Sequence, residues 1–194
     1  MITLGLDIDE TIIKTIKYDG FIDRPDDAEF YFTVGENEFK ENFALYKRPY
    51  LDEFMNFVNK NFNVFFYTRA DKTYAEIILK FLKFDNYPLY AREFTIKKEE
   101  LIILPYKGEV KIYKFVKDLR IVAQDIGIEL EDIVFIDDVV DKDQLLQPEL
   151  TIRIPEFDNE IDDFDLKIIK NHMEQGIEYD IEVFKTYLRS LNFY

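Results

Sequence analysis

The sequence predicts an α/β fold in which a mainly parallel central sheet carries helices on both faces. Three short, continuous apolar runs are typical of buried strands: residues 2–6, 63–67 and 133–136. Stretches with apolar side chains at helical spacing lie between them. Buried strands that alternate with amphipathic helices are typical of a parallel sheet covered on both sides. The length of 194 residues suits one domain with a substantial core, and we expect residues 1–194 to form it.

Capping and spacing signals place the helices. Pro49 suits the start of an amphipathic helix, and Asp71 can cap a second one. A third helix is expected over about 116–126, ending at Gly127. The chain is expected to close with a short strand at 150–154 and with C-terminal helices within about 163–191, near 163–174 and 180–191.

Two small β insertions are expected to interrupt the alternation, at about residues 18–47 and 94–113. The expected strand pairs are 30–33 with 38–39, turning at Gly35, and 101–104 with 109–113, turning at 105–108. Neither insertion is long enough for a large helical cap, so we expect the edge of the sheet to remain open.

Composition limits the partners. The formal net charge of −15 argues against nucleic acid, because a phosphate backbone needs a basic surface. A phosphorylated substrate would need a local exception to this negative field. The chain has no cysteine, which excludes a disulfide, a thiolate zinc site and a cysteine nucleophile. It has no long apolar run and no basic, apolar leader, so we expect no membrane partner and an intracellular, cytoplasmic location, or a nuclear one in a eukaryote. The oligomeric state stays open.

Polar side chains stand where three of the predicted strands end: Asp7, Thr68 and Asp137. The carboxyl ends of parallel strands meet at one edge of the sheet, where ligands of such folds bind. We therefore expect these three side chains to lie close together.

The acids at this edge have a chemical interpretation. Asp7 and Asp9 would point to the same side of an extended strand end, so one could attack phosphorus while the other transfers a proton. Read alone, the pair is a weak signal, because two such acids often only cap a turn or a helix. Asp137 and Asp138, together with Asp7, supply hard oxygen ligands suited to Mg²⁺. Asp141 and Asp143 follow, either as supporting contacts to such a site or as solvated loop acids.

Two further residues could contact a phosphoryl group. The Thr68 hydroxyl could bind a phosphoryl oxygen or cap the next helix. Lys117 stands near the start of a predicted helix, where a cation opposes the helix dipole. It could neutralise a phosphoryl group, or it could be a solvated surface charge.

The order of these residues resembles the haloacid dehalogenase (HAD) superfamily of phosphotransferases. The DIDET segment at residues 7–11 is similar to the DLDET start of its FCP/SCP-like branch, the NLI-interacting-factor-like phosphatases. Further matches to that branch are RPYLDEF at 48–54, FYT at 66–68, Tyr74-Ala75, Arg92-Glu93 and VKDL at 116–119. The chain departs from the branch at Val139-Val140, where Ser-Pro is usual, and at Arg69-Ala70, where Ala-Ser is usual.

The resemblance implies a HAD-type, Rossmann-like domain and a set of roles. In such enzymes Asp7 would be the nucleophile and Asp9 the general acid and base. The resemblance further implies that Mg²⁺ is held by Asp7, the backbone carbonyl of Asp9 and the pair Asp137 and Asp138, and that phosphoryl oxygens are held by Thr68, Lys117 and a nearby arginine, Arg69 or Arg92.

The resemblance and the open edge together favour a phosphorylated protein or peptide as substrate, phosphoserine or phosphothreonine first. One alternative is a phosphatase for a nucleotide or sugar phosphate, with a lid from a partner subunit. The other is a non-catalytic binding module similar to the mitochondrial import receptor subunit of this branch.

Overall fold

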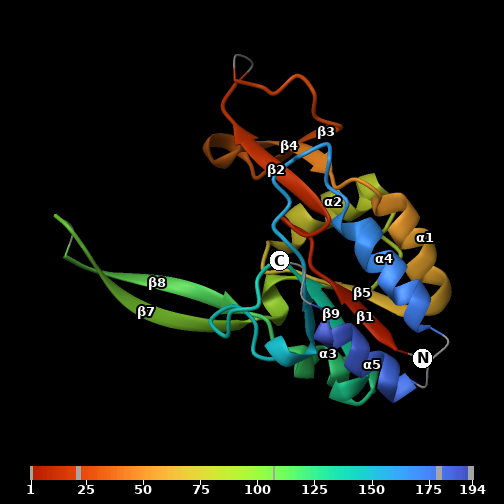
Figure 1. Ribbon diagram of the computed structural model, residues 1–194. Coiled ribbons are helices and arrows are strands. Elements are labelled where there is room, and N and C mark those ends of the chain that lie inside the picture. Colours follow the sequence, from red (N-terminus) through yellow and green to blue (C-terminus); the bar gives the residue numbers. More distant parts are fainter. Residues whose placement is uncertain (1, 21–22, 107, 178–180, 192–194) are drawn as a thin grey trace.

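A five-stranded parallel sheet forms the centre of the computed structural model (Figure 1), which describes residues 2–20, 23–106, 108–177 and 181–191. The strand order is β10 (Thr151–Arg153), β9 (Ile133–Asp137), β1 (Thr3–Leu6), β5 (Asn63–Tyr67) and β6 (Leu89–Tyr90). All four neighbouring pairs are parallel. Parts of the expected first insertion, second turn and last helix, and both ends of the expected domain, lie outside the described residues.

Helices cover both faces of the sheet, as the alternating pattern predicted. One buried cluster joins even-numbered strand residues such as Leu4 and Phe66 to α1 (Leu51–Asn61), α2 (Lys72–Leu82), α4 (Asp165–Gly176) and α5 (Ile181–Ser190). The opposite cluster joins Phe65 and Phe135 to α3 (Leu119–Ile126). Both faces of each central strand are therefore buried, which explains their continuous apolar sequences. None of the described helices is long and apolar enough to cross a membrane.

Gly5 lets the central strand fit between two aromatic rings. A Cβ at this position would lie 2.4 Å from both Phe135 Cδ2 and Phe65 Cζ. We expect Gly5→Ala to lower the free energy of unfolding by about 1–3 kcal/mol, measured by urea denaturation. In a Phe65→Leu background, where a smaller side chain replaces one of the two rings, Gly5→Ala should lower the free energy of unfolding by less than it does in the parent. Strictly additive effects would contradict this packing explanation.

The first insertion is a three-stranded antiparallel sheet, and it begins earlier than expected. Its order is β2 (Ile13–Tyr18), β4 (Glu41–Lys47), β3 (Phe30–Val34). The predicted partner of 30–33 was wrong: β3 pairs with β4, and residues 37–39 form a 3₁₀ turn. Gly35, at φ +88°, starts that turn, and a side chain there would meet the backbone of Phe39. The strand therefore resumes only after the turn is complete.

The second insertion is a longer hairpin than predicted. It consists of β7 (Ile96–Leu104) and β8 (Gly108–Val116), joined through nine registered pairs. The hairpin projects from the body of the protein (Figure 1). We call residues 96–116 the arm.

The third predicted helix starts later than expected. Asp118 caps α3 by accepting a hydrogen bond from the backbone N–H of Arg120, and Gly127 ends the helix as predicted. Lys117 therefore precedes the helix, where it forms an isolated bridge with Leu145. Lys117 thus lies near the start of a helix, as expected, but the expected helix start at about residue 116 was wrong. The short strand β6 was not predicted, because two residues carry no periodic signal.

Candidate active site

The polar side chains at the strand ends gather at one edge of the sheet, in or directly behind a single cleft. Asp7 follows β1 and Thr68 follows β5, while Asp137 is the last residue of β9. The register aligns the three strands, with Leu6 paired to both Phe66 and Ile136. The cleft has a volume of about 440 Å³. Of the seven predicted site residues, its walls include Asp7, Asp9, Thr68, Arg69 and Asp138.

The other two, Lys117 and Asp137, are buried and connect to this cleft through Asp7. The Lys117 ammonium donates hydrogen bonds to Asp7 and, over 2.7 Å, to Asp137 Oδ2. Burial lowers the pKa of Lys117, but Asp137 and Asp7 outweigh it and hold the pKa above its usual value. The backbone N–H of Lys117 donates to Gln144 O over 2.8 Å. The backbone of Lys117 therefore pairs with Gln144 and Leu145 instead of joining the helix, and this pairing holds the Lys117 ammonium beside the acids.

Three acids crowd around this single ammonium. Asp7, Asp137 and Asp138 each offer a carboxylate oxygen, and these oxygens lie within 4.8 Å of one another. Burial, reinforced by Asp137 and Asp138, raises the pKa of Asp7 well above its usual range despite Lys117. Burial and Asp137 raise the pKa of Asp138 to about 6. The cluster therefore has an excess of buried negative charge, and its hard oxygen atoms fit Mg²⁺.

Thr11 and a backbone amide orient the acids of this cluster. The Thr11 hydroxyl donates to Asp138 Oδ1 and accepts from the Asp138 N–H, both over 3.1 Å. The Val139 N–H donates to Asp137 Oδ1 over 2.9 Å. The sequence placed Thr11 in the first motif but gave it no partner. Its role follows from the pairing of β1 with β9.

Tyr74 holds Asp9 and was missed as a site residue. Its hydroxyl donates to Asp9 Oδ1 over 2.5 Å and contacts the Thr15 hydroxyl at 2.8 Å. Burial raises the pKa of Asp9 to about 6, although the bond from Tyr74 lowers it. In the sequence, Tyr74 stood out only as part of a match to the FCP/SCP-like branch, with no role at the site. A tyrosine on a buried helix face usually finds a polar partner, and this was the available signal.

Two arginines border the cleft beside Thr68. The buried Thr68 donates its N–H to Tyr90 O over 2.9 Å, and its hydroxyl accepts from the Ala70 N–H over 3.0 Å. Arg92 Nε donates to Arg69 O over 2.9 Å, and the Arg92 guanidinium lies over the Phe115 ring. These two arginines provide local positive charge, which a phosphorylated ligand would need in order to approach a protein that is negatively charged overall.

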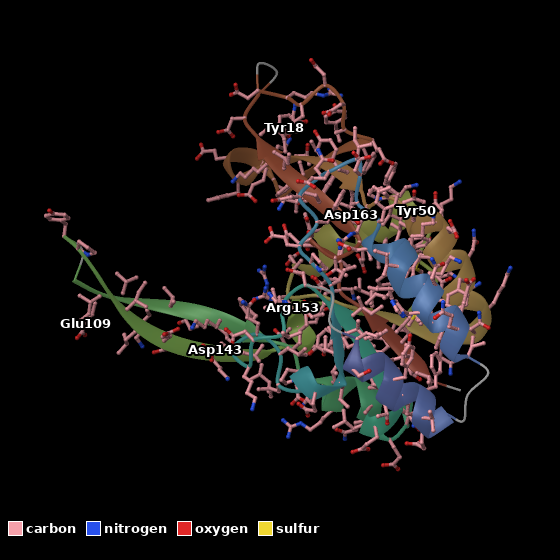
Figure 2. The ribbon with its side chains drawn as sticks, viewed as in Figure 1. Tyr18, Tyr50, Glu109, Asp143, Arg153 and Asp163 are labelled. Carbon is pink, nitrogen blue, oxygen red and sulfur yellow. The ribbon has the colours of Figure 1, made fainter. Side chains whose placement is uncertain are left out.

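Asp141 and Asp143 lie apart from the acidic cluster. Both are exposed, and the Asp141 carboxylate accepts from the Asp143 N–H. Asp143 lies 3.5 Å from the ammonium of Lys114, at the base of the arm (Figure 2). The solvated-loop interpretation describes their surroundings better than a supporting role at a metal.

The fold and the cleft define an α/β protein with an acidic cluster, a lysine and two arginines at the carboxyl edge of its sheet. The family described as NLI interacting factor-like phosphatase matches residues 2–183. The chain therefore belongs to the NLI interacting factor-like phosphatase family, as the DIDET segment indicated.

Relatives agree with this assignment. The chain is 31% identical over 102 residues to the CTD phosphatase-like protein 355R of Invertebrate iridescent virus 6, covering 51% of this chain and 48% of the viral protein. A variant of the fission yeast RNA polymerase II CTD phosphatase Fcp1 bound to beryllium fluoride has a TM-score of 0.56 at 17% identity, over 87% of this chain and 44% of Fcp1. A second structure of Fcp1 has a TM-score of 0.55 at 15% identity, over 96% and 56%.

The structural likeness confirms the predicted fold class, and at such identities it carries no more than the fold. The chain spans about half the length of the relatives it matches, from 44% to 56%.

Proposed function

We propose that this chain is a Mg²⁺-dependent phosphomonoester hydrolase that works through an aspartyl-phosphate on Asp7. One observation carries the proposal: Asp7, Asp9 and Asp138 line a single cleft, and the buried Lys117 and Asp137 lie directly behind Asp7. A nucleophile, a proton carrier and a site for positive charge are what phosphoryl transfer requires.

The acidic cluster is the proposed metal site. Mg²⁺ would be held by Asp7, the backbone carbonyl of Asp9 and the Asp137–Asp138 pair. Asp138 is the better candidate for a direct ligand, because it lines the cleft while Asp137 bonds to Lys117 and Val139. When bound, the ion supplies positive charge that offsets the charge on the phosphoryl oxygens.

The chemistry needs two displacements. In the first, an Asp7 carboxylate oxygen bonds to phosphorus, the bond to the leaving oxygen breaks, and Asp9 gives that oxygen its proton. In the second, Asp9 takes a proton from water, the water oxygen bonds to phosphorus, and the bond to Asp7 breaks to release inorganic phosphate. A pKa of about 6, to which burial raises Asp9, suits both directions of proton transfer near neutral pH.

Thr68, Lys117 and Arg69 are the proposed partners of the phosphoryl oxygens. Thr68 and Arg69 line the cleft, and the Lys117 ammonium donates a hydrogen bond to Asp7, the proposed nucleophile. Fixed donors stabilise the transferring group because they need no reorganisation during the reaction.

A phosphorylated protein or peptide, with phosphoserine or phosphothreonine, is the proposed substrate. Among the residues that the structure describes, no helix caps the cleft, and the cleft adjoins two surface grooves. One passes over Val34 and Phe43 of the first insertion, and the other over Tyr113 and Phe115 of the arm. Open grooves on either side suit a phosphate presented by a polypeptide. The CTD phosphatase descriptions of the viral relative and of Fcp1 are consistent with this class.

Tyr74 is proposed to position Asp9. Tyr74→Phe removes the hydroxyl that donates to Asp9 Oδ1, so Asp9 loses its orientation toward the leaving oxygen. We expect kcat to fall by about tenfold and KM to change by less than about twofold. Steady-state kinetics with p-nitrophenyl phosphate measures both constants. Thr15→Val, which removes only the outer contact of Tyr74, is the control and should retain most of kcat.

The proposal as a whole is tested by p-nitrophenyl phosphate hydrolysis with and without Mg²⁺, followed by phosphoserine peptides, nucleotides and sugar phosphates. Turnover only with Mg²⁺ and preferential use of phosphopeptides are expected. Preference for a nucleotide or sugar phosphate would favour the small-molecule alternative. If a folded sample gives no turnover and beryllium fluoride with Mg²⁺ does not raise its Tm, the catalytic proposal fails and a binding module takes its place.

A further inference from the structure

The arm is a two-stranded hairpin that forms its own sheet, separate from the other two sheets. Within the described part of the chain, β7 and β8 form a sheet only with each other. Isolated two-stranded hairpins are marginally stable in water. Leu101, Ile103 and Tyr113 of the arm are nevertheless 60%, 80% and 48% exposed. An exposed hairpin with large apolar side chains is typical of a surface that binds a partner.

These exposed side chains share one face of the arm. Paired residues of an antiparallel ladder point to the same side, and the side alternates along each strand. The register pairs Lys97 with Phe115, Glu99 with Tyr113, and Leu101 with Lys111, followed by Ile103 with Glu109. The face so defined carries four apolar or aromatic side chains, two lysines and two glutamates, and we call it the stripe: Phe115, Tyr113, Leu101, Ile103, Lys97, Lys111, Glu99 and Glu109. Figure 2 labels Glu109 toward the far end of the arm and Asp143 at its base.

The stripe starts where the cleft ends. Tyr113 and Phe115 line a groove of about 450 Å³ together with Arg69 and Arg92. The same two arginines line the cleft that contains Asp7. An extended chain that leaves the cleft over Arg92 therefore reaches Phe115 and continues onto the stripe.

The charge of the arm differs from that of the whole protein. Residues 96–116 contain five lysines and three glutamates, a net charge of +2, whereas the chain carries −15. On the stripe, Lys97 lies 3.8 Å from the centre of the Tyr113 ring, and Lys111 pairs with Glu99 over 2.6 Å. The stripe itself carries two lysines and two glutamates, so it is a neutral surface on a strongly acidic protein and can face charged side chains of either sign.

We propose that the stripe binds the substrate polypeptide on one side of its phosphorylated residue, as an extended segment in which apolar side chains alternate with charged side chains of both signs. The inference rests on the proposed phosphatase function and adds a substrate class to it. Apolar side chains of the segment pack on Leu101, Ile103 and Tyr113, while its charged side chains face the two lysines and the two glutamates of the stripe. The arm is itself ordered by this contact, since the bound segment covers its exposed face.

Adjacent isoleucines give a matched test. Ile103 belongs to the stripe, whereas Ile102 points to the opposite face and is half-buried. The probes are a phosphoserine tripeptide, Gly-phosphoserine-Gly, and the same tripeptide extended on its amino or its carboxyl side by valine alternating with glutamate and lysine in turn. The extension has about ten residues, the length of one arm strand.

One of the two extended peptides is expected to have a KM about tenfold below that of the tripeptide. Ile103→Ser should raise the KM of that peptide about fivefold. It should leave the tripeptide and p-nitrophenyl phosphate unchanged. Ile102→Ser should leave the advantage of the extended peptide in place.

Equal KM values for tripeptide and extended peptides would overturn the proposal, as would equal effects of the two serine variants. If light scattering instead finds a dimer that Ile103→Ser dissociates, with KM unchanged, the stripe binds a second copy and the proposal is wrong. Failure of the phosphatase function is distinct, because no substrate would then turn over. In that case the binding of the labelled extended peptides is measured by fluorescence anisotropy. Binding to the parent that is lost in Ile103→Ser would support the stripe as the binding surface, and no binding to the parent would overturn the proposal.

Discussion

Asp7→Asn is expected to lower Mg²⁺-dependent hydrolysis of p-nitrophenyl phosphate by at least about three orders of magnitude. An amide nitrogen and a neutral carbonyl oxygen cannot replace the carboxylate as nucleophile, so the first displacement is lost. The acidic cluster also loses one of its three carboxylates, which weakens the proposed metal site. Both losses act on the same step, and neither can be compensated by higher substrate concentration.

The same substitution should leave the fold intact. The side-chain oxygen of asparagine can still accept the hydrogen bond from Lys117, and Lys117 keeps its bond to Asp137. Burial, with Asp137 and Asp138, raises the pKa of Asp7 well above its usual range, so the ionised form is unfavourable in the metal-free protein. Removing that charge relieves repulsion. We expect the Tm without metal to equal or exceed that of the parent.

Asp143→Asn is the matched control. It makes the same chemical change on the same side of the molecule, at an exposed residue whose ion pair with Lys114 spans 3.5 Å. Exposed pairs contribute little to stability, so turnover and Tm should stay close to the parent values. If Asp7→Asn retained turnover while Asp143→Asn lost it, the nucleophile would have to be sought elsewhere. A Tm rise with Mg²⁺ in the parent, absent in Asp7→Asn, would locate the ion independently of activity.

The parts of the fold that could be predicted from sequence are those set by burial. Residues 2–6, 63–67 and 133–136 are apolar throughout because both faces of the central sheet are covered. The same topology brings Asp7, Thr68 and Asp137 to one edge, so the strand ends identified the cleft before any contact was known. Local caps were equally readable, as at Asp71, whose side chain accepts from the Thr73 N–H.

The parts that sequence could not give depend on contacts between distant residues. Lys117 looked like a helix residue because the apolar spacing of α3 extends back to Val116. The bridge to Leu145 and the pairing of β8 with β7 instead draw Val116 and Lys117 out of the helix. Likewise, the bonds of Tyr74 to Asp9 and of Thr11 to Asp138 join residues 65 and 127 positions apart. Spacing along the chain carries no information about such pairs.

Arg48→Met is expected to lower the free energy of unfolding by about 3–5 kcal/mol, because it leaves two partly buried acids without their cation. Arg48 is 0% exposed. Its guanidinium donates to Asp163 Oδ2 over 2.9 Å and to Asp165 Oδ2 over 2.8 Å. It also donates to the carbonyl oxygens of Thr11 and Pro155, each over 2.9 Å. Methionine fills a similar volume but satisfies none of these four acceptors.

Arg48 links the candidate site to the closing helices. Thr11 precedes the first insertion and holds Asp138. Asp163, which Figure 2 labels, lies just before α4, and Asp165 is the first residue of that helix. Burial and the neighbouring Asp163 raise the pKa of Asp165 even with Arg48 present. Without the guanidinium the two carboxylates would repel each other more strongly. The segment that supports Thr11 should therefore loosen, and the Tm rise caused by Mg²⁺ should shrink.

Two further variants test whether the effect depends on the positive charge of Arg48 or on the hydrogen-bond geometry of its guanidinium. Arg48→Lys keeps the charge but cannot reach all four acceptors with one ammonium, so an intermediate loss of about 1–3 kcal/mol is expected. Lys17→Met breaks the exposed pair with Glu41 and should cost less than about 1 kcal/mol. Thermal unfolding measures all three, and the Arg48→Met shift should be on the order of 10 °C. A shift no larger than that of Lys17→Met would mean that the surrounding backbone, rather than the guanidinium, joins the first motif to the closing helices.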